Sequence, residues 1–234
     1  MIINPVTLRN DLDKIEDIEK ASLRLVVQAV LDFRAEAAII FEKENDLVAD
    51  IGEDLTREAL DNMGMSTVKR RLFGKIDYKK ARYIFNSEYA LKQALFVDSK
   101  AEKDSGRRTA TIQTTQLSMW VRQIRSGIEI NEKGKLPFVV DGEFLSTTIF
   151  VKYNYVEIEG NDMLVDIIVA ALPNGMLQER YNPDANNTIF LAGRNAPTRG
   201  EDFRVRISFS KLKEKCNWRV QTIPLYPEEF IWEN

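Results

Sequence analysis

The chain has 234 residues, a net charge of −3 at pH 7 and a 44% share of hydrophobic residues, a composition typical of a globular protein built as one large domain. It contains no histidine and one cysteine, Cys216, which excludes Ser-His and Cys-His catalysis, histidine-ligated metals and an internal disulfide. No apolar run is long enough to span a bilayer, and the N-terminus lacks a signal-peptide pattern. We therefore expect a cytoplasmic protein with no membrane partner.

The charges are unevenly distributed. The first 64 residues are strongly acidic, and the remainder carries a net positive charge. Basic side chains gather in two groups, Lys69, Arg70, Arg71, Lys75, Lys79, Lys80 and Arg82, and, nearer the C-terminus, Arg194, Arg199, Arg204 and Arg206. Such groups can neutralise DNA phosphates even in an acidic chain, although solvated basic loops are the alternative.

Two helices are predicted in the N-terminal part. Between residues 11 and 43, apolar side chains recur at helical spacing: Ile15, Ile18, Leu25, Val26, Ala29, Val30, Phe33, Ala37, Ile40 and Phe41. Asn10 or Asp11 is the expected cap, and the apolar stripe is either core or a dimer contact. A shorter helix is predicted for residues 52–63. Glu53 at its start either joins a metal site or complements the helix dipole.

The stretch from residue 74 to 103, GKIDYKKARYIFNSEYALKQALFVDSKAEK, is predicted to form a β-hairpin. Residues 82–85 and 94–97 are the β-prone runs, and the polar turn lies between them. Asp77 precedes the first strand. Asp98 and Lys100 follow the second and point to the same side by strand alternation. The hairpin therefore brings two carboxylates and one ammonium together at the rim of a sheet.

These three groups suit metal-assisted hydrolysis of a phosphodiester. Mg²⁺ binds through one or two carboxylates and substrate phosphate oxygens, and it acidifies a bound water. A nearby lysine can orient that water or stabilise the developing charge. From the spacing alone, a strand that ends in solvated charges is the commoner explanation.

The second half of the chain is predicted to contain more strand than helix. The expected elements are a polar loop at 103–111, a helix at 114–125, a loop at 126–134, strands at 148–155 and 163–172 joined by a tight turn, a polar segment at 180–199, an alternating strand at 203–209, a helix at 211–214 and a strand at 218–223. On the alternating strand, Arg204, Arg206 and Ser208 share one face, and Val205, Ile207 and Phe209 share the other.

Several strings in the chain resemble the SfiI-like group of type II restriction endonucleases, within the PD-(D/E)xK nuclease superfamily. They are GKIDYKKARY, LFVDSKA, QERYNPD, PTRGEDFRVR and KLKEKCNWR. The likeness covers most of the chain. It implies an α/β (α+β mixed) fold with a central mixed β-sheet flanked by helices. It also implies a single endonuclease domain over residues 1–234, with a DNA-reading β region at about 178–222.

The resemblance also implies roles for individual residues. Asp77, Asp98 and the carbonyl of Ser99 would ligate Mg²⁺, with Glu53 as a further candidate. Lys100 would position or activate the attacking water, which makes Asp77, Asp98 and Lys100 the expected catalytic residues.

The implied partner is symmetric double-stranded DNA, bound by a homodimer or homotetramer, with a cognate DNA methyltransferase encoded alongside. The expected DNA-binding residues are Arg204, Arg206, Arg199, Arg194, Lys79 and Arg71. Arg204 and Arg206 are the candidates for base reading, and arginine favours guanine. Two alternatives stay open, a PD-(D/E)xK repair or structure-specific nuclease and a non-catalytic DNA-binding protein that retains the fold.

Overall fold

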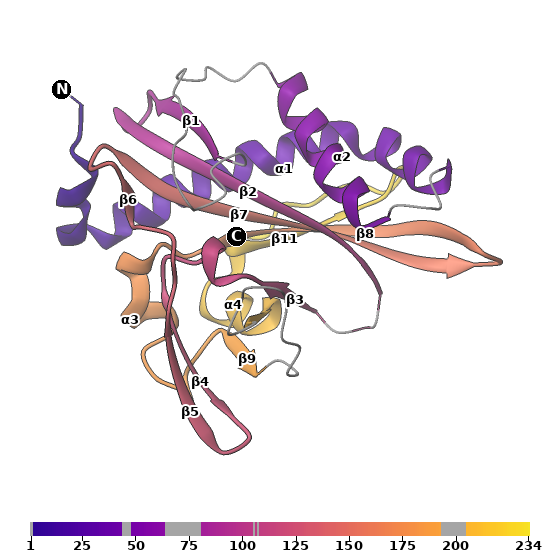
Figure 1. The fold of residues 1–234 in the computed structure, drawn as a ribbon. Helices are drawn as coiled ribbons and strands as arrows, with labels where there is room; N and C mark the ends of the chain where they lie inside the picture. Colours follow the sequence, from indigo (N-terminus) through magenta and orange to yellow (C-terminus); the bar gives the residue numbers. More distant parts are fainter. Residues whose placement is uncertain (1, 44–47, 64–80, 105, 107, 193–204) are drawn as a thin grey trace.

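The computed structural model describes residues 2–43, 48–63, 81–104, 106, 108–192 and 205–234. Figure 1 shows helices on one side of a long twisted sheet and a smaller β region on the other. The helices are α1 (Leu12–Lys43), α2 (Val48–Asn62), α3 (Gln178–Tyr181) and α4 (Phe209–Lys215), with 3₁₀ turns η1 (Pro5–Asn10), η3 (Thr114–Gln116), η4 (Gly175–Leu177) and η5 (Asn217–Arg219). The strands are β1 (Ala81–Asn86), β2 (Leu91–Lys103), β3 (Thr109–Ile112), β4 (Trp120–Arg125), β5 (Ile128–Lys133), β6 (Val139–Val140), β7 (Phe144–Ile158), β8 (Asn161–Leu172), β9 (Phe190–Ala192), β10 (Val205–Ser208) and β11 (Val220–Pro224).

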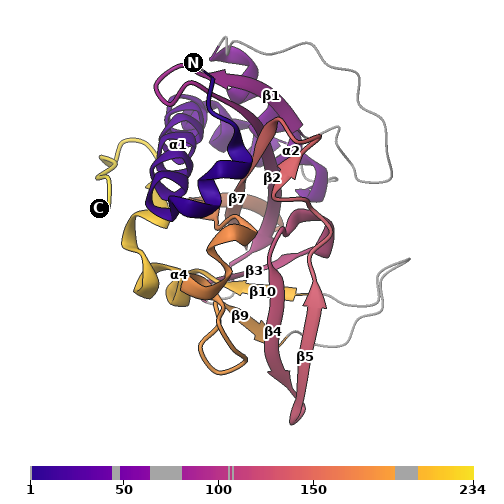
Figure 2. The same ribbon diagram turned by 90° about the vertical axis from the view of Figure 1, so that its left-hand side faces the viewer.

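The main sheet has the strand order β1-β2-β7-β8-β11, with β6 beside β7. Strands β2 and β7 are parallel, and the other pairs are antiparallel. The expected mixed sheet flanked by helices is therefore confirmed. Helices α1 and α2 cover one face, while β3, β10, β9 and α4 lie against the other (Figure 2).

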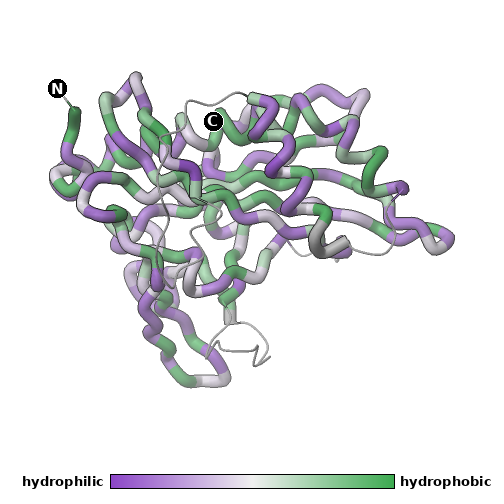
Figure 3. The backbone as a smooth tube through the Cα atoms, turned by 45° about the horizontal axis from the view of Figure 1, so that its top comes forward, coloured by the Kyte–Doolittle hydropathy of each residue, from purple (hydrophilic) through white to green (hydrophobic). Residues whose placement is uncertain are grey.

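The long N-terminal helix is confirmed, and its apolar stripe is core. Val26 and Val30 are among its buried residues, and they pack with strand residues such as Ile149 and Val169. The Asp11 carboxylate accepts a hydrogen bond from the Lys14 amide at 3.2 Å, as expected of a cap. In Figure 3 the middle of the large sheet is mainly hydrophobic, which matches its burial on both faces.

Helix α2 begins at Val48 and not at Gly52. Gly52 lies inside the helix, where it rests on the backbone of β2. A Cβ added there would lie 3.0 Å from the Ala101 nitrogen and 3.2 Å from the Lys100 carbonyl carbon. Glycine thus permits a close approach between helix and strand. Farther along α2, the Thr56 hydroxyl hydrogen-bonds the Tyr153 hydroxyl at 2.9 Å, and burial raises the pKa of Tyr153.

The prediction of a helix at 114–125 followed by a loop is wrong. Residues 120–125 and 128–133 form the antiparallel hairpin β4–β5, which projects from the body of the molecule (Figures 1 and 2). Ser126 and Gly127 both have positive φ, 50° and 78°, as a two-residue hairpin turn requires. Leu117, Trp120, Val121 and Ile124 imitate a helical stripe, but the turn and the packing of Val121 against the smaller sheet favour a strand.

Three further boundaries differ from the sequence-based expectation. Strand β2 runs on through Asp98 and Lys100 to Lys103, because its pairing with β7 continues to that point. Strand β9 falls inside the segment expected to be irregular. The alternating strand ends at Ser208, whose hydroxyl accepts from the Lys211 amide and caps α4. In the described residues, no helix is long and apolar enough to cross a membrane.

Candidate active site

Strand β2 places Asp98 and Lys100 on one face of the main sheet. Their partners on β7 are Phe150 and Lys152, and Phe150 belongs to the core on the side away from α1 and α2. The carboxylate-bearing residue Asp98 is 3% exposed. The Lys100 Nζ donates a hydrogen bond to the Thr111 carbonyl of β3 at 2.7 Å. The smaller sheet therefore fixes the position of the ammonium, on the face of β2 that also carries Asp98.

Ser99 faces the opposite side of β2, toward α2. It lines a pocket of about 360 Å³ together with Glu53, Asp61, Arg82 and other residues. The side chains of Glu53 and Asp98 thus lie on opposite faces of the strand. Glu53 can approach the Asp98 side only around the edge of β2, whereas Asp98 and Lys100 share one face of the strand.

The donors present fit a hard divalent cation. Asp98 and the Ser99 carbonyl supply oxygen atoms on consecutive residues. Within the described part of the chain, no three acidic or cysteine side chains form a cluster that could hold a metal. A site with few protein ligands suits an ion that keeps waters and uses phosphate oxygens, as Mg²⁺ does.

Several expected site residues lie outside the described residues. They are Asp77, Lys79, Arg71, Arg194, Arg199 and Arg204. The nearest described position to Asp77 is Ala81, the first residue of β1, which pairs with Phe96 of β2. Asp98 is two residues past Phe96 on the same strand.

The alternation expected around Arg206 is observed. Val205 and Ile207 are fully buried, and Arg206 points to the other face of β10. Its Nη2 donates to the Thr109 hydroxyl at 2.8 Å. Arg206 and Lys100 both bond to β3, so one short strand connects the candidate base-reading residue with the candidate catalytic lysine.

Two charged residues next to Lys100, Lys152 and Glu102, are not among the site residues predicted from the sequence. Lys152 of β7 is the direct partner of Lys100 across the strand pair, and its side chain is 3% exposed. Its Nζ lies 3.4 Å from the Glu102 carboxylate. The signal in the sequence is a lysine inside the otherwise apolar run Ile149–Tyr153, and such a residue also fits an exposed strand position.

Comparison with known proteins identifies the family. A family model described as type II restriction enzyme SfiI matches residues 24–223. The type II restriction enzyme SfiI of Streptomyces fimbriatus is 37% identical over 230 residues, covering 91% of this chain and 85% of that protein.

Solved structures agree with this match. The crystal structure of tetrameric SfiI bound to cognate DNA superposes with a TM-score of 0.81 and 33% identity, covering 94% of this chain and 87% of that one. Restriction endonuclease BglI bound to its DNA recognition sequence has a TM-score of 0.76 at 18% identity, with 94% of each chain covered, and shows the shared fold. The chain therefore belongs to the SfiI family of type II restriction enzymes and is a site-specific deoxyribonuclease.

Proposed function

We propose that the enzyme hydrolyses both strands of double-stranded DNA at a divalent-metal site, with Mg²⁺ as the ion, and that Asp77, Asp98 and Lys100 are its catalytic residues. The observation that carries this proposal is that the buried Asp98 and Lys100 share one face of β2, with the Lys100 ammonium hydrogen-bonded to the Thr111 carbonyl. We also propose that residues 1–234 form one endonuclease domain and that its DNA-reading part spans about residues 178–222.

Chain connectivity supports the inclusion of Asp77. It is four residues before Ala81, and four residues span at most about 14 Å. Ala81 lies opposite Phe96, two residues from Asp98. Asp77 is thus tethered within reach of the face that carries Asp98 and Lys100.

The proposed chemistry divides the work among these groups. Asp98, Asp77 and the Ser99 carbonyl would hold the ion, with Glu53 as a further candidate at the strand edge. When bound, the ion supplies Lewis-acid stabilisation of the phosphate and acidifies water. Lys100 presents its ammonium protons to the attacking water or to a phosphate oxygen, where negative charge develops. Because the Thr111 carbonyl fixes the ammonium in advance, little reorganisation is needed during the reaction.

Substitution of the two described catalytic residues tests this assignment. Asp98→Asn and Lys100→Ala should abolish Mg²⁺-dependent cleavage of mapped plasmid DNA while the fold and most DNA binding persist. The matched controls are Asp104→Asn and Lys103→Ala, near the end of the same strand, where Lys103 forms an exposed ion pair with Glu157. Cleavage by Asp98→Asn or Lys100→Ala at the wild-type rate would show that the active site lies elsewhere.

Assembly and biological setting complete the proposal. Cutting both strands of a symmetric site requires two active sites, so a two-fold dimer is the minimum. The tetrameric state of SfiI on DNA supports a tetramer here as well. Light scattering on cognate DNA distinguishes the two, and a monomer there would contradict both. A cytoplasmic location and a neighbouring methyltransferase that protects host DNA follow from the restriction role.

A further inference from the structure

Lys152 is a buried charge that the proposed mechanism does not use. It lies in the centre of the main sheet on β7, and its side chain is 3% exposed. Residues paired across neighbouring strands point to the same face, so Lys152 and its partner Lys100 leave the sheet side by side. Burial of an ammonium is costly unless an anion compensates it.

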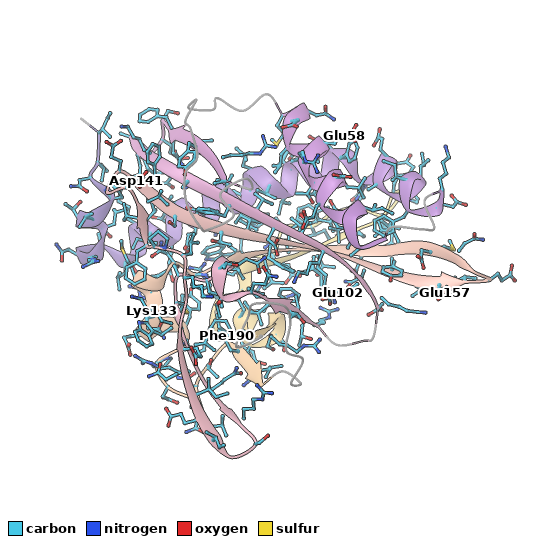
Figure 4. All side chains as sticks on the ribbon, in the orientation of Figure 1. Glu58, Glu102, Lys133, Asp141, Glu157 and Phe190 are labelled. Atoms are coloured by element: carbon cyan, nitrogen blue, oxygen red, sulfur yellow. The ribbon has the colours of Figure 1, made fainter. Side chains whose placement is uncertain are left out.

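The compensating anion is Glu102. Its carboxylate lies 3.4 Å from the Lys152 Nζ, and its side chain is 28% exposed. Figure 4 labels Glu102 on the side of the sheet opposite Glu58 of α2. Two more carboxylates belong to this face: Asp166, which accepts a hydrogen bond from the Asn154 side-chain amide, and Asp98, which is assigned above to the metal ion. Among the residues that the structure describes, Glu102 is therefore the ion-pair partner of Lys152.

Glu102 is also well placed to attract Lys100. The two residues are separated by one position on β2, so their side chains share a face, and their Cα atoms are about 7 Å apart. A lysine side chain reaches across that distance. An ion pair between Lys100 and Glu102 would draw the ammonium toward the far end of the strand. The Lys100 Nζ is instead hydrogen-bonded to the Thr111 carbonyl of β3.

We propose that Lys152 is a positioning residue, which holds the Glu102 carboxylate so that Lys100 stays at the reacting phosphate. The role rests on the proposed catalytic function of Lys100. Lys152 contributes its charge to Glu102 and has no contact with DNA in this role. Its effect on the rate therefore depends on the presence of the Glu102 carboxylate, which distinguishes it from a phosphate-binding lysine.

Lys152→Met tests the inference because methionine keeps an unbranched side chain and removes the charge. In single-turnover cleavage the rate constant should fall roughly 10- to 100-fold, the scale of a misplaced catalytic group. The Kd for cognate DNA should change less than about threefold, since the role is not in binding. Adding Glu102→Gln should restore the rate to within about fivefold of the Glu102→Gln single variant. The matched control is Lys103→Met. Lys103 of β2 forms an exposed ion pair with Glu157 of β7, and loss of that pair should leave the rate constant unchanged.

The double variant Lys152→Met/Glu102→Gln tests the positioning role even if Lys152→Met alone fails to fold. It removes both charges of the ion pair, so neither is left buried without a partner. If Lys152→Met in the Glu102→Gln background loses as much rate as in the wild type, Lys152 acts directly and the positioning role is wrong. A Lys152→Met enzyme that folds and cleaves at full rate refutes it equally. The Lys100→Ala variant distinguishes a failure of the proposed catalytic role of Lys100 from a failure of the positioning role of Lys152. An active Lys100→Ala enzyme refutes the catalytic assignment, whereas an inactive one beside a fully active Lys152→Met enzyme refutes only the positioning role.

Discussion

Removal of Glu19 should destabilise the protein more than any surface ion-pair change. Arg219 is fully buried, and its guanidinium lies between the rings of Tyr181 and Trp218, 4.4 and 4.5 Å from their centroids. Its Nη2 is 2.7 Å from the Glu19 carboxylate, which is also fully buried. The atoms meet as an ion contact without favourable hydrogen-bond angles. The other carboxylate oxygen of Glu19 accepts a hydrogen bond from the backbone N–H of Asn174 at 2.7 Å.

Glu19→Ala removes this buried anion and leaves the guanidinium with only the more distant, partly exposed Glu16 carboxylate, 3.5 Å from Nη2, among the described residues. Breaking a buried ion pair from one side costs about 3–5 kcal/mol. For a chain of this size each kcal/mol lowers Tm by about 2–4 °C, so Tm should fall by about 6–20 °C. Scanning calorimetry at fixed protein concentration measures this, because oligomer dissociation also shifts Tm.

Asp13→Ala is the matched control on the same helix. Asp13 pairs with Arg180 at 2.8 Å, but its side chain is 86% exposed. Exposed pairs are worth at most about 1 kcal/mol, so Tm should fall by no more than about 4 °C. If Glu19→Ala and Asp13→Ala lower Tm equally, the buried pair does not hold α1 against η5, and the reasoning fails.

Two other substitutions test the contacts of β2 and β10. In an exposed helix, a Gly→Ala substitution stabilises by about 1 kcal/mol. In Gly52→Ala, however, the added Cβ would lie 3.0 Å from the β2 backbone, and such overpacking costs about 1–3 kcal/mol. Urea unfolding should show a net loss of stability accompanied by slower cleavage, and a gain would mean that α2 does not rest on β2. Arg206→Ala should weaken binding of cognate DNA by about 1–3 kcal/mol if Arg206 reads a guanine. Equal weakening on random duplexes, with a shallower salt dependence, would instead indicate a phosphate contact.

The sequence predicted best the features that depend on local periodicity. The long helix, the β1–β2 and β7–β8 hairpins and the burial of Val205 and Ile207 all follow from regular apolar spacing. The β4–β5 hairpin was mistaken for a helix because Leu117, Val121 and Ile124 fit the period of 3.6 as well as any true helix. The positive-φ turn at Ser126 and Gly127 and the packing of Val121 against the smaller sheet favour the hairpin.

The active site was predictable in part for a related reason. Asp98 and Lys100 are close in sequence and on one strand, so alternation places them together. Thr111 and Lys152 are brought to Lys100 by the smaller sheet and by strand pairing. These contacts depend on which strands are neighbours, and no spacing within the chain encodes that arrangement.

The parallel pairing of β2 with β7 also determines when the enzyme can become active during synthesis. Asp98 pairs with Phe150, and the anchor of Lys100 lies on β3, whose partner strand β10 begins at Val205. Ribosomes deliver the N-terminal part first, and contacts between residues so distant in sequence form late and slowly. A nascent polypeptide therefore carries Asp98 and Lys100 without the strands that hold them in place. Incomplete translation products of this gene should be harmless to the chromosome of the cell that makes them.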